Sequence, residues 1–157
     1  MSWKKFTGEP LENSIFEEVE YILAREKRLG HNLKVCIGTD SQVKGGQIHF
    51  ATVITFLRQK NGGFMFIHQD KTKNHMNIRQ RMLLEVQKSI EIAHELRYIF
   101  DKNDIDLEIH VDINTQPRFK SYDALQDAVG YIIGMGFNFK AKPDAFASSS
   151  CANKWVQ

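Results

Sequence analysis

Two short glycine turns constrain the fold of this chain most strongly. Gly45 and Gly46 follow a stretch at 33–40, and an Asn-Gly-Gly turn at 61–63 separates stretches at 47–59 and 64–70. All three stretches are rich in the β-branched, aromatic and other apolar residues that favour strands. Glycine turns of this kind join neighbouring strands into hairpins. The sequence therefore predicts three consecutive strands in an antiparallel meander.

Helices and strands alternate after the meander. Helical periodicity at 77–100 and 121–136 alternates with strand patterns at 105–114 and 137–143, and a short helix is expected at 144–156. A further helix at 14–28 begins with a capping box formed by Ser14 and Glu17. We predict an α/β fold with a mixed five-stranded sheet, in which strands 1-2-3 form the meander and strands 4 and 5 are parallel. Helices flank this sheet.

The length of the chain is typical of one domain with its own core. It has 157 residues, of which 42% are hydrophobic and 25% are charged. We expect a single domain over residues 1–157, with residues 1–31 as an N-terminal helical extension. Cys36 and Cys151 lack the spacing of a thiolate zinc site. Neither a signal peptide nor a membrane-spanning apolar run is evident, so we expect a cytoplasmic protein with no membrane contact.

Two aspartates follow apolar strand patterns at corresponding places in the predicted sheet. Asp40 comes at the end of the first strand, and Asp112 lies near the end of the fourth. An aspartate at such a place is often a turn residue. In two parallel neighbouring strands, however, both carboxylates lie at the same edge, where ligands of α/β sheets bind. Two carboxylates this close together are unfavourable unless a cation lies between them.

A third acid is identified by its position on the helix at 77–100. At about 100° per residue, Glu85 lies about 60° from the centre of the apolar face, whereas Glu91 and Glu95 face solvent. Glu85 can therefore lean toward the sheet, although a boundary glutamate with a solvated carboxylate has the same pattern. Asp144 follows the last strand and is a fourth candidate, with a helix N-cap as the alternative role.

Asp40, Glu85 and Asp112 form an all-oxygen set of ligands, which Asp144 could join while it also caps the helix. Such a set suits Mg²⁺ or Mn²⁺ better than Zn²⁺. Carboxylates that hold two such ions are the usual machinery of phosphodiester cleavage. We therefore predict that Asp40, Glu85, Asp112 and Asp144 are both metal ligands and catalytic residues. His110 shares a strand face with Asp112, and we interpret it as a packing or hydrogen-bonding residue.

A basic segment separates the meander from the long helix. The net charge of the whole chain is only +2, which permits nucleic-acid binding without arguing for it. Positive charge is concentrated at 69–81, and a solvated surface is the alternative interpretation. The candidate phosphate-binding residues of this segment are Lys71, Lys73, His75, Arg79 and Arg81.

The acids and the order of elements resemble the ribonuclease H-like superfamily. The matching motifs are "IGTDSQ" around Asp40, "RMLLEV" around Glu85, "HVDIN" around Asp112 and "KPDAF" around Asp144. Together with the "KPDAFASSSCA" tail, they look most like the uncharacterised YkuK-type family of predicted ribonuclease H-like nucleases. The resemblance implies a ribonuclease H-like fold and a nuclease that depends on Mg²⁺ or Mn²⁺.

Three functions are compatible with such a fold. The first is a two-metal nuclease acting on RNA, DNA or a hybrid of the two. The second is a catalytically silent nucleic-acid-binding module on the same fold, because a fold does not fix a function. The third is a phosphotransferase built from two such halves. It is disfavoured by the length of the chain and by the lack of a glycine-rich phosphate loop after Asp40.

Overall fold

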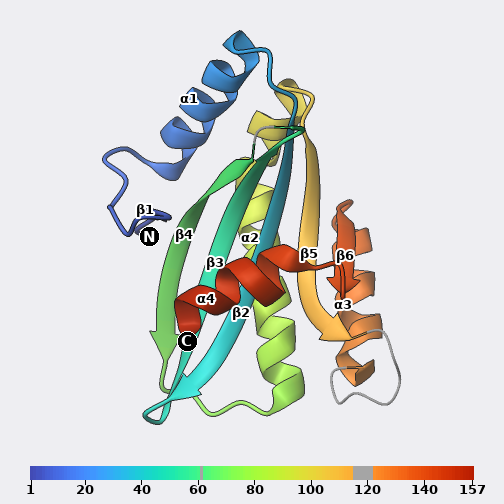
Figure 1. Ribbon diagram of the computed structural model, residues 1–157. Helices are drawn as coiled ribbons and strands as arrows, with labels where there is room; N and C mark the ends of the chain where they lie inside the picture. Colours follow the sequence, from blue (N-terminus) through green and yellow to red (C-terminus); the bar gives the residue numbers. More distant parts are fainter. Residues whose placement is uncertain (61, 115–121) are drawn as a thin grey trace.

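A six-stranded mixed sheet forms the centre of the molecule (Figure 1). The computed structural model describes residues 1–60, 62–114 and 122–157. The strands are β1 (Lys4–Lys5), β2 (Leu33–Lys44), β3 (Gln47–Arg58), β4 (Gly63–Thr72), β5 (Asp106–Asn114) and β6 (Asn138–Lys142). The helices are α1 (Ile15–Arg28), α2 (Ile78–Lys102), α3 (Tyr122–Gly134), the π-helix η1 (Ala147–Ala152) and α4 (Asn153–Val156).

The sheet has the predicted pairing, with one strand more than predicted. Its order is β1-β4-β3-β2-β5-β6. β2, β3 and β4 form the antiparallel meander, whereas β2–β5 and β5–β6 are parallel pairs. The prediction of five strands is wrong because Lys4 and Lys5 pair antiparallel with β4. Two residues carry no alternating pattern, and they become a strand only because the edge of β4 offers unpaired backbone groups.

The first glycine turn lies where the sequence predicted it. Gly45 and Gly46 have φ values of 56° and 76°, which glycine adopts without steric cost. Asn61, in the second predicted turn, lies outside the described residues. The predicted end of the first strand at Asp40 is wrong. β2 continues to Lys44 because its pairing with β3 extends over its whole length, past the point where the apolar pattern stops.

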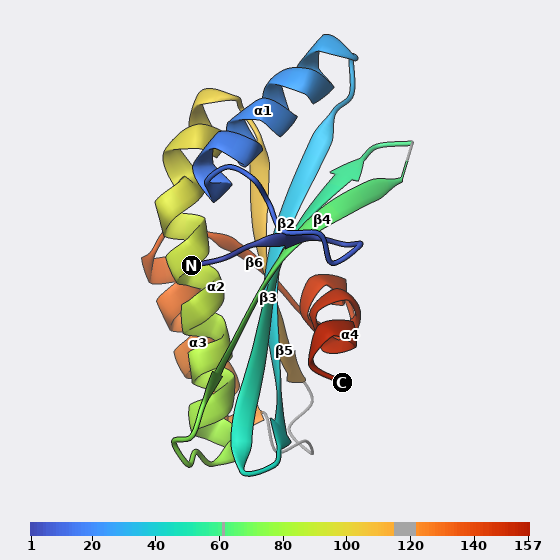
Figure 2. The ribbon, with the colours of Figure 1, turned by 90° about the vertical axis from the view of Figure 1, so that its left-hand side faces the viewer.

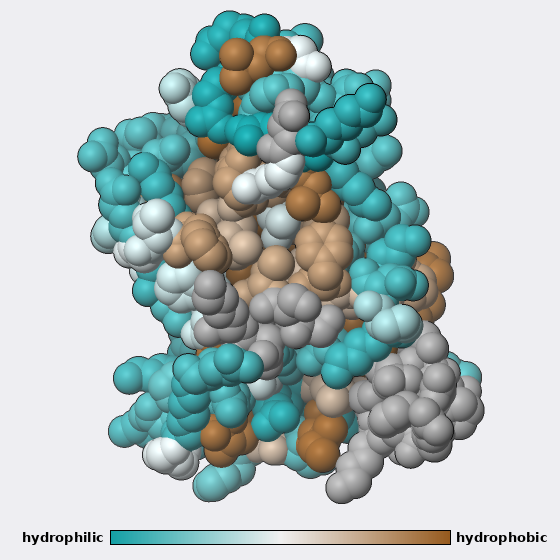
Figure 3. All heavy atoms as spheres, in the orientation of Figure 1, coloured by the Kyte–Doolittle hydropathy of each residue, from teal (hydrophilic) through white to brown (hydrophobic). Residues whose placement is uncertain are grey.

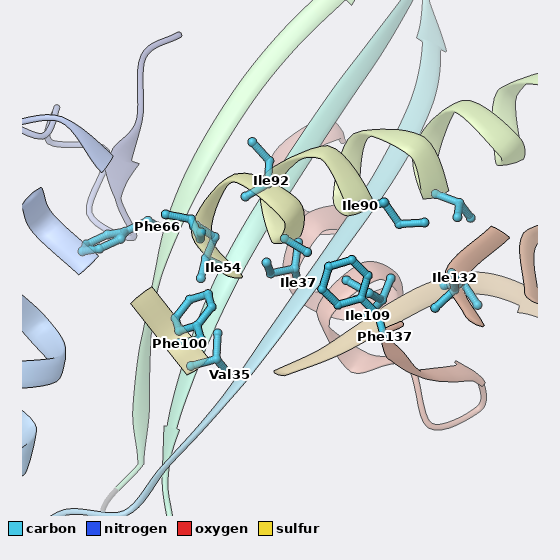
Figure 4. Packing of buried hydrophobic residues seen from close by; sticks show 14 of the residues in the cluster. Val35, Ile37, Ile54, Phe66, Ile90, Ile92, Phe100, Ile109, Ile132 and Phe137 are labelled. Carbon is cyan, nitrogen blue, oxygen red and sulfur yellow. The ribbon is translucent and has the colours of Figure 1, made fainter. Parts of the chain in front are cut away.

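Helices cover the two faces of the sheet unequally. α1, α2 and α3 lie on one face, and α4 lies on the other (Figure 2). The main core lies between the sheet and α2. Figure 4 shows Val35, Ile37 and Ile54 of the sheet facing Ile90 and Phe100 of this helix. This face of β2 continues toward its carboxyl end with Thr39 and Ser41, which are also buried.

The opposite face of the sheet carries a second, smaller core. Cys36 of β2 and Val53 of β3 pack there against Ala147 and Ala152 of η1. Between η1 and α1 this face is apolar and hollowed, and hydrophilic residues lie above the hollow and at its sides (Figure 3). Within residues 1–60, 62–114 and 122–157, no helix is both long and apolar enough to cross a membrane.

A buried carboxylate holds α1 against the sheet. Glu26 of α1 is 1% exposed, Nε of Arg58 on β3 donates to its Oε1 at 2.7 Å, and an Nη of Arg58 forms an ion pair with the same oxygen at 2.6 Å. Nδ1 of His31 lies 2.6 Å from the other carboxylate oxygen. Burial alone would raise the pKa of Glu26, but the hydrogen bonds from Arg58 and His31 outweigh burial and lower it to about 2.

Candidate metal centre

The candidate site lies where β2 and β5 separate. The regular pairing of these parallel strands ends at Gly38 and His110, and the strands then diverge (Figure 1). Asp40 and Asp112 are each two residues further along. Alternation places them on the strand face of Cys36 and His110, which η1 covers. Both carboxylates therefore border the gap between the diverging strands.

Glu85 approaches this gap from the opposite face of the sheet. It lies on α2, and it is only 6% exposed. The Ser41 hydroxyl donates to Oε1 of Glu85 at 2.6 Å. The alternative of a boundary glutamate with a solvated carboxylate is therefore wrong, because the Glu85 carboxylate is buried and accepts a hydrogen bond from Ser41. Glu91 and Glu95 of the same helix are exposed, as their positions on the helix predicted.

Three elements thus bring three acids together. Carboxylate oxygens of Asp40, Glu85 and Asp112 all lie within 4.8 Å of one another, and we call these residues the carboxylate cluster. Asp144 is exposed and does not belong to this cluster. The helix expected at 144–156 begins later than predicted, since η1 starts at Ala147. Asp144 therefore lies before that helix rather than in its first turn.

The electrostatics of the cluster favour a bound cation. Burial raises the pKa of Glu85 well above its ordinary value, and the charges of Asp40 and Asp112 raise it further. The hydrogen bond from Ser41 and the charge of Arg81 act in the opposite direction. Asp112 is paired with a positive charge, because Nζ of Lys142 on β6 lies 2.9 Å from its Oδ1. A divalent cation would relieve the remaining repulsion among the carboxylates.

Hydroxyl groups fix the cluster on its α2 side. Ser41 orients two of the three acids, because its backbone N–H donates to Oδ1 of Asp40 at 2.9 Å while its hydroxyl binds Glu85. One turn further along α2, the Ser89 hydroxyl lies 2.7 Å from the Thr39 hydroxyl, which also contacts Thr52. Sequence reasoning did not identify Ser41. The sequence could have identified it by strand alternation, because Ser41 lies on the same face of its strand as Ile37 and Thr39, and that face packs against α2.

The basic segment lies at the end of the molecule where α2 begins (Figure 1). Lys71, Lys73 and His75 are exposed, which is compatible both with phosphate binding and with a solvated surface. Arg79 is exposed and forms an ion pair with Asp127 of α3. Arg81 is half-buried, and its Nε is buried without a hydrogen-bond partner. Arg81 is one helical turn before Glu85, so the basic segment and the carboxylate cluster are adjacent.

A second group of possible ligands lies beside the cluster. Ligand atoms of Cys36, Glu108 and His110 also lie within 4.8 Å of one another. The Ala147 N–H donates to Nδ1 of His110 at 3.1 Å, so the proton is on Nε2, which lies 3.0 Å from Glu108. Both ring nitrogens are thus engaged in hydrogen bonds. Burial raises the pKa of the Cys36 thiol to about 12, which leaves it protonated. In the described structure His110 thus links Glu108 of its own strand to the backbone of η1.

Three comparisons with known proteins place the chain beside a protein family, a curated relative and a solved structure. A family model described as "Ribonuclease H-like" matches residues 14–157. The chain is 26% identical over 162 residues to the uncharacterized protein YkuK of Bacillus subtilis strain 168, covering 91% of this chain and 89% of that protein. Among solved structures, RNase H1 from the halophilic archaeon Halobacterium salinarum NRC-1 aligns with a TM-score of 0.44 and 18% identity. That alignment covers 77% of this chain and 96% of the RNase H1 chain.

Proposed function

Since the chain belongs to the ribonuclease H-like family, as its motifs predicted, we propose that it is a divalent-metal-dependent nuclease that hydrolyses phosphodiester bonds. One observation carries this proposal. Asp40, Glu85 and Asp112 come from three separate elements, and their carboxylate oxygens lie within 4.8 Å of one another. A largely buried group of like charges is costly without a cation, and it is therefore a candidate for function.

The ligands of the cluster fit Mg²⁺ or Mn²⁺. All three are carboxylates, and these hard cations prefer oxygen ligands. A bound divalent ion in such a site lowers the pKa of its water and stabilises negative charge on a phosphoryl oxygen. Asp40, Glu85 and Asp112 would hold the ion. The role predicted for Asp144 as a further ligand remains a prediction, since its side chain lies outside the cluster.

The residues around the cluster hold the ligands in position. Ser41 fixes the orientation of Asp40 and Glu85 through its backbone N–H and its hydroxyl, so that neither carboxylate has to be ordered when a cation binds. The hydroxyl contacts of Thr39 hold β2 against α2 one turn away. Preorganised ligands of this kind reduce the entropic cost of binding.

The basic segment supplies the contacts to the nucleic-acid backbone in this proposal. Lys71, Lys73 and His75 are exposed near the start of α2, and Arg81 places a positive charge beside the cluster. Contacts between such side chains and phosphates are independent of sequence and sensitive to salt. They would hold the backbone so that a phosphate reaches the carboxylate cluster.

A panel of labelled nucleic acids tests the proposal. Single-stranded RNA, single-stranded DNA, both duplexes and an RNA–DNA hybrid are incubated with Mg²⁺ or Mn²⁺ and with the natural protein or Asp40→Asn. The proposal predicts cleavage of at least one substrate by the natural protein and its loss in the variant. Equal cleavage by both proteins would refute the metal site. Salt-sensitive binding without cleavage by either protein would instead support a catalytically silent binding module.

A further inference from the structure

A lysine takes part in the charge balance of the carboxylate cluster. Nζ of Lys142 lies 2.9 Å from Oδ1 of Asp112, whose side chain is 15% exposed. Lys142 is on β6, a strand that contributes none of the three acids. It is therefore a fourth charged group at the site, of opposite sign, brought there by a fourth element of the fold.

An irregularity in the sheet places Lys142 beside Asp112. In the pairing of β5 with β6, Lys140 lies opposite His110, but Lys142 lies opposite Asn114. β5 thus uses four residue steps where β6 uses two, and Asp112 is in the middle of the bulged segment. Bulges redirect side chains and are frequent beside active sites. Here the bulge turns the Asp112 carboxylate toward the last residue of β6.

The charges of these residues match a single divalent cation. The three carboxylates carry three negative charges when ionised, and the Lys142 ammonium carries one positive charge. Among the described residues Arg81 adds a further positive charge beside the cluster, so one divalent ion more than offsets the remaining negative charge, whereas two would leave a large excess of positive charge. Asp144, the fourth acid that the sequence predicted as a metal ligand, is exposed and lies outside the cluster.

We propose that the site binds a single divalent ion and that Lys142 takes the place of a second cation. This inference rests on the proposed nuclease function and specifies its cofactor content. An ammonium group has three N–H donors. Since Lys142 is 40% exposed, its ammonium group can keep the ion pair with Asp112 and donate to a phosphate oxygen of the substrate at the same time. Lys142 thus neutralises charge that a second metal ion would otherwise neutralise.

The test is Mn²⁺ binding to the full chain without nucleic acid, followed by calorimetry and electron paramagnetic resonance. The natural protein is expected to bind one Mn²⁺ per chain and to give the spectrum of an isolated ion. The Lys142 ammonium group repels a cation bound to the carboxylates. Lys142→Ala removes this repulsion, so Mn²⁺ should bind about tenfold more tightly. Lys142→Arg keeps the charge and should behave like the natural protein. Lys140→Ala, two residues earlier on β6 and exposed, is the matched control and should leave binding unchanged.

The possible outcomes separate this inference from the proposed function. Two ions per chain in the natural protein, or the spectrum of a magnetically coupled pair, would overturn the role of Lys142 and leave the nuclease proposal intact. Weaker or unchanged Mn²⁺ binding by folded Lys142→Ala would also overturn it. Weaker binding would mean that Lys142 helps the natural protein to bind the metal ion by positioning Asp112, and unchanged binding would mean that its charge has no effect on the metal ion. No Mn²⁺ binding by the natural protein would overturn the metal site itself. The stoichiometry of the natural protein decides the matter even if Lys142→Ala fails to fold.

Discussion

Replacing Glu85 by glutamine should stabilise the metal-free protein and abolish its response to metal. The substitution removes one charge within 4.8 Å of two other carboxylates, and glutamine can still accept the hydrogen bond from Ser41. Coulomb's law gives about 3.5 kcal/mol for one such pair at an effective dielectric constant of about 20, and about 0.9 kcal/mol at about 80. Since the raised pKa of Glu85 already relieves part of this repulsion, we expect a gain of about 1–3 kcal/mol.

Thermal unfolding measures this gain. For a chain of this length, about 1 kcal/mol shifts Tm by about 2–4 °C, so Glu85→Gln should raise the Tm by about 2–12 °C in the presence of a chelator. Saturating Mn²⁺ should raise the Tm of the natural protein and leave that of Glu85→Gln almost unchanged. Glu91→Gln makes the same chemical change at an exposed position of α2 and should alter neither value. A lower Tm of Glu85→Gln in chelator, or an unchanged response to Mn²⁺, would refute the reasoning.

Three further predictions concern other parts of the molecule. Glu26 has a pKa of about 2 in the folded state and an ordinary value of 4.5, so its stabilisation is complete above pH 4.5 and is lost as the pH falls toward 2. Acid titration of the unfolding free energy should show about 3 kcal/mol from this residue, and Glu26→Gln should remove that pH dependence. Ser41→Ala should weaken Mn²⁺ binding by about 10–100-fold in calorimetry; unchanged affinity would contradict the positioning role of Ser41. Lys71→Ala and Lys73→Ala should each reduce the salt dependence of nucleic-acid binding by about one unit of slope in filter-binding assays, and an unchanged slope would exclude that lysine as a phosphate contact.

The central part of the fold follows from local patterns in the sequence. Glycine turns and β-rich stretches predicted the meander, and helical periodicity predicted α2 together with the buried side of Glu85. Parallel pairing of β2 with β5 then brought Asp40 and Asp112 to the same place. These features depend on residues close together in the chain or on general rules of sheet topology, so a single sequence is sufficient to predict them.

Other features depend on partners that are distant in the chain. β1 exists because the edge of β4 is available, and the end of β2 is set by its pairing with β3. Lys142 reaches Asp112 because of a bulge in β5, and no residue type in that segment signals the irregularity. Glu26 is buried because Arg58, on another element, binds it. Each case is decided by tertiary contacts, which composition and periodicity do not contain.

Anomalous diffraction from crystals grown with Mn²⁺ would test the central claim most directly. The claim is that Asp40, Glu85 and Asp112 hold a divalent ion where β2 and β5 diverge. The account predicts a manganese peak coordinated by oxygens of these three carboxylates, and no such peak in crystals of Asp40→Asn. A cluster without manganese at a saturating concentration, or a peak bound elsewhere and retained in Asp40→Asn, would contradict it.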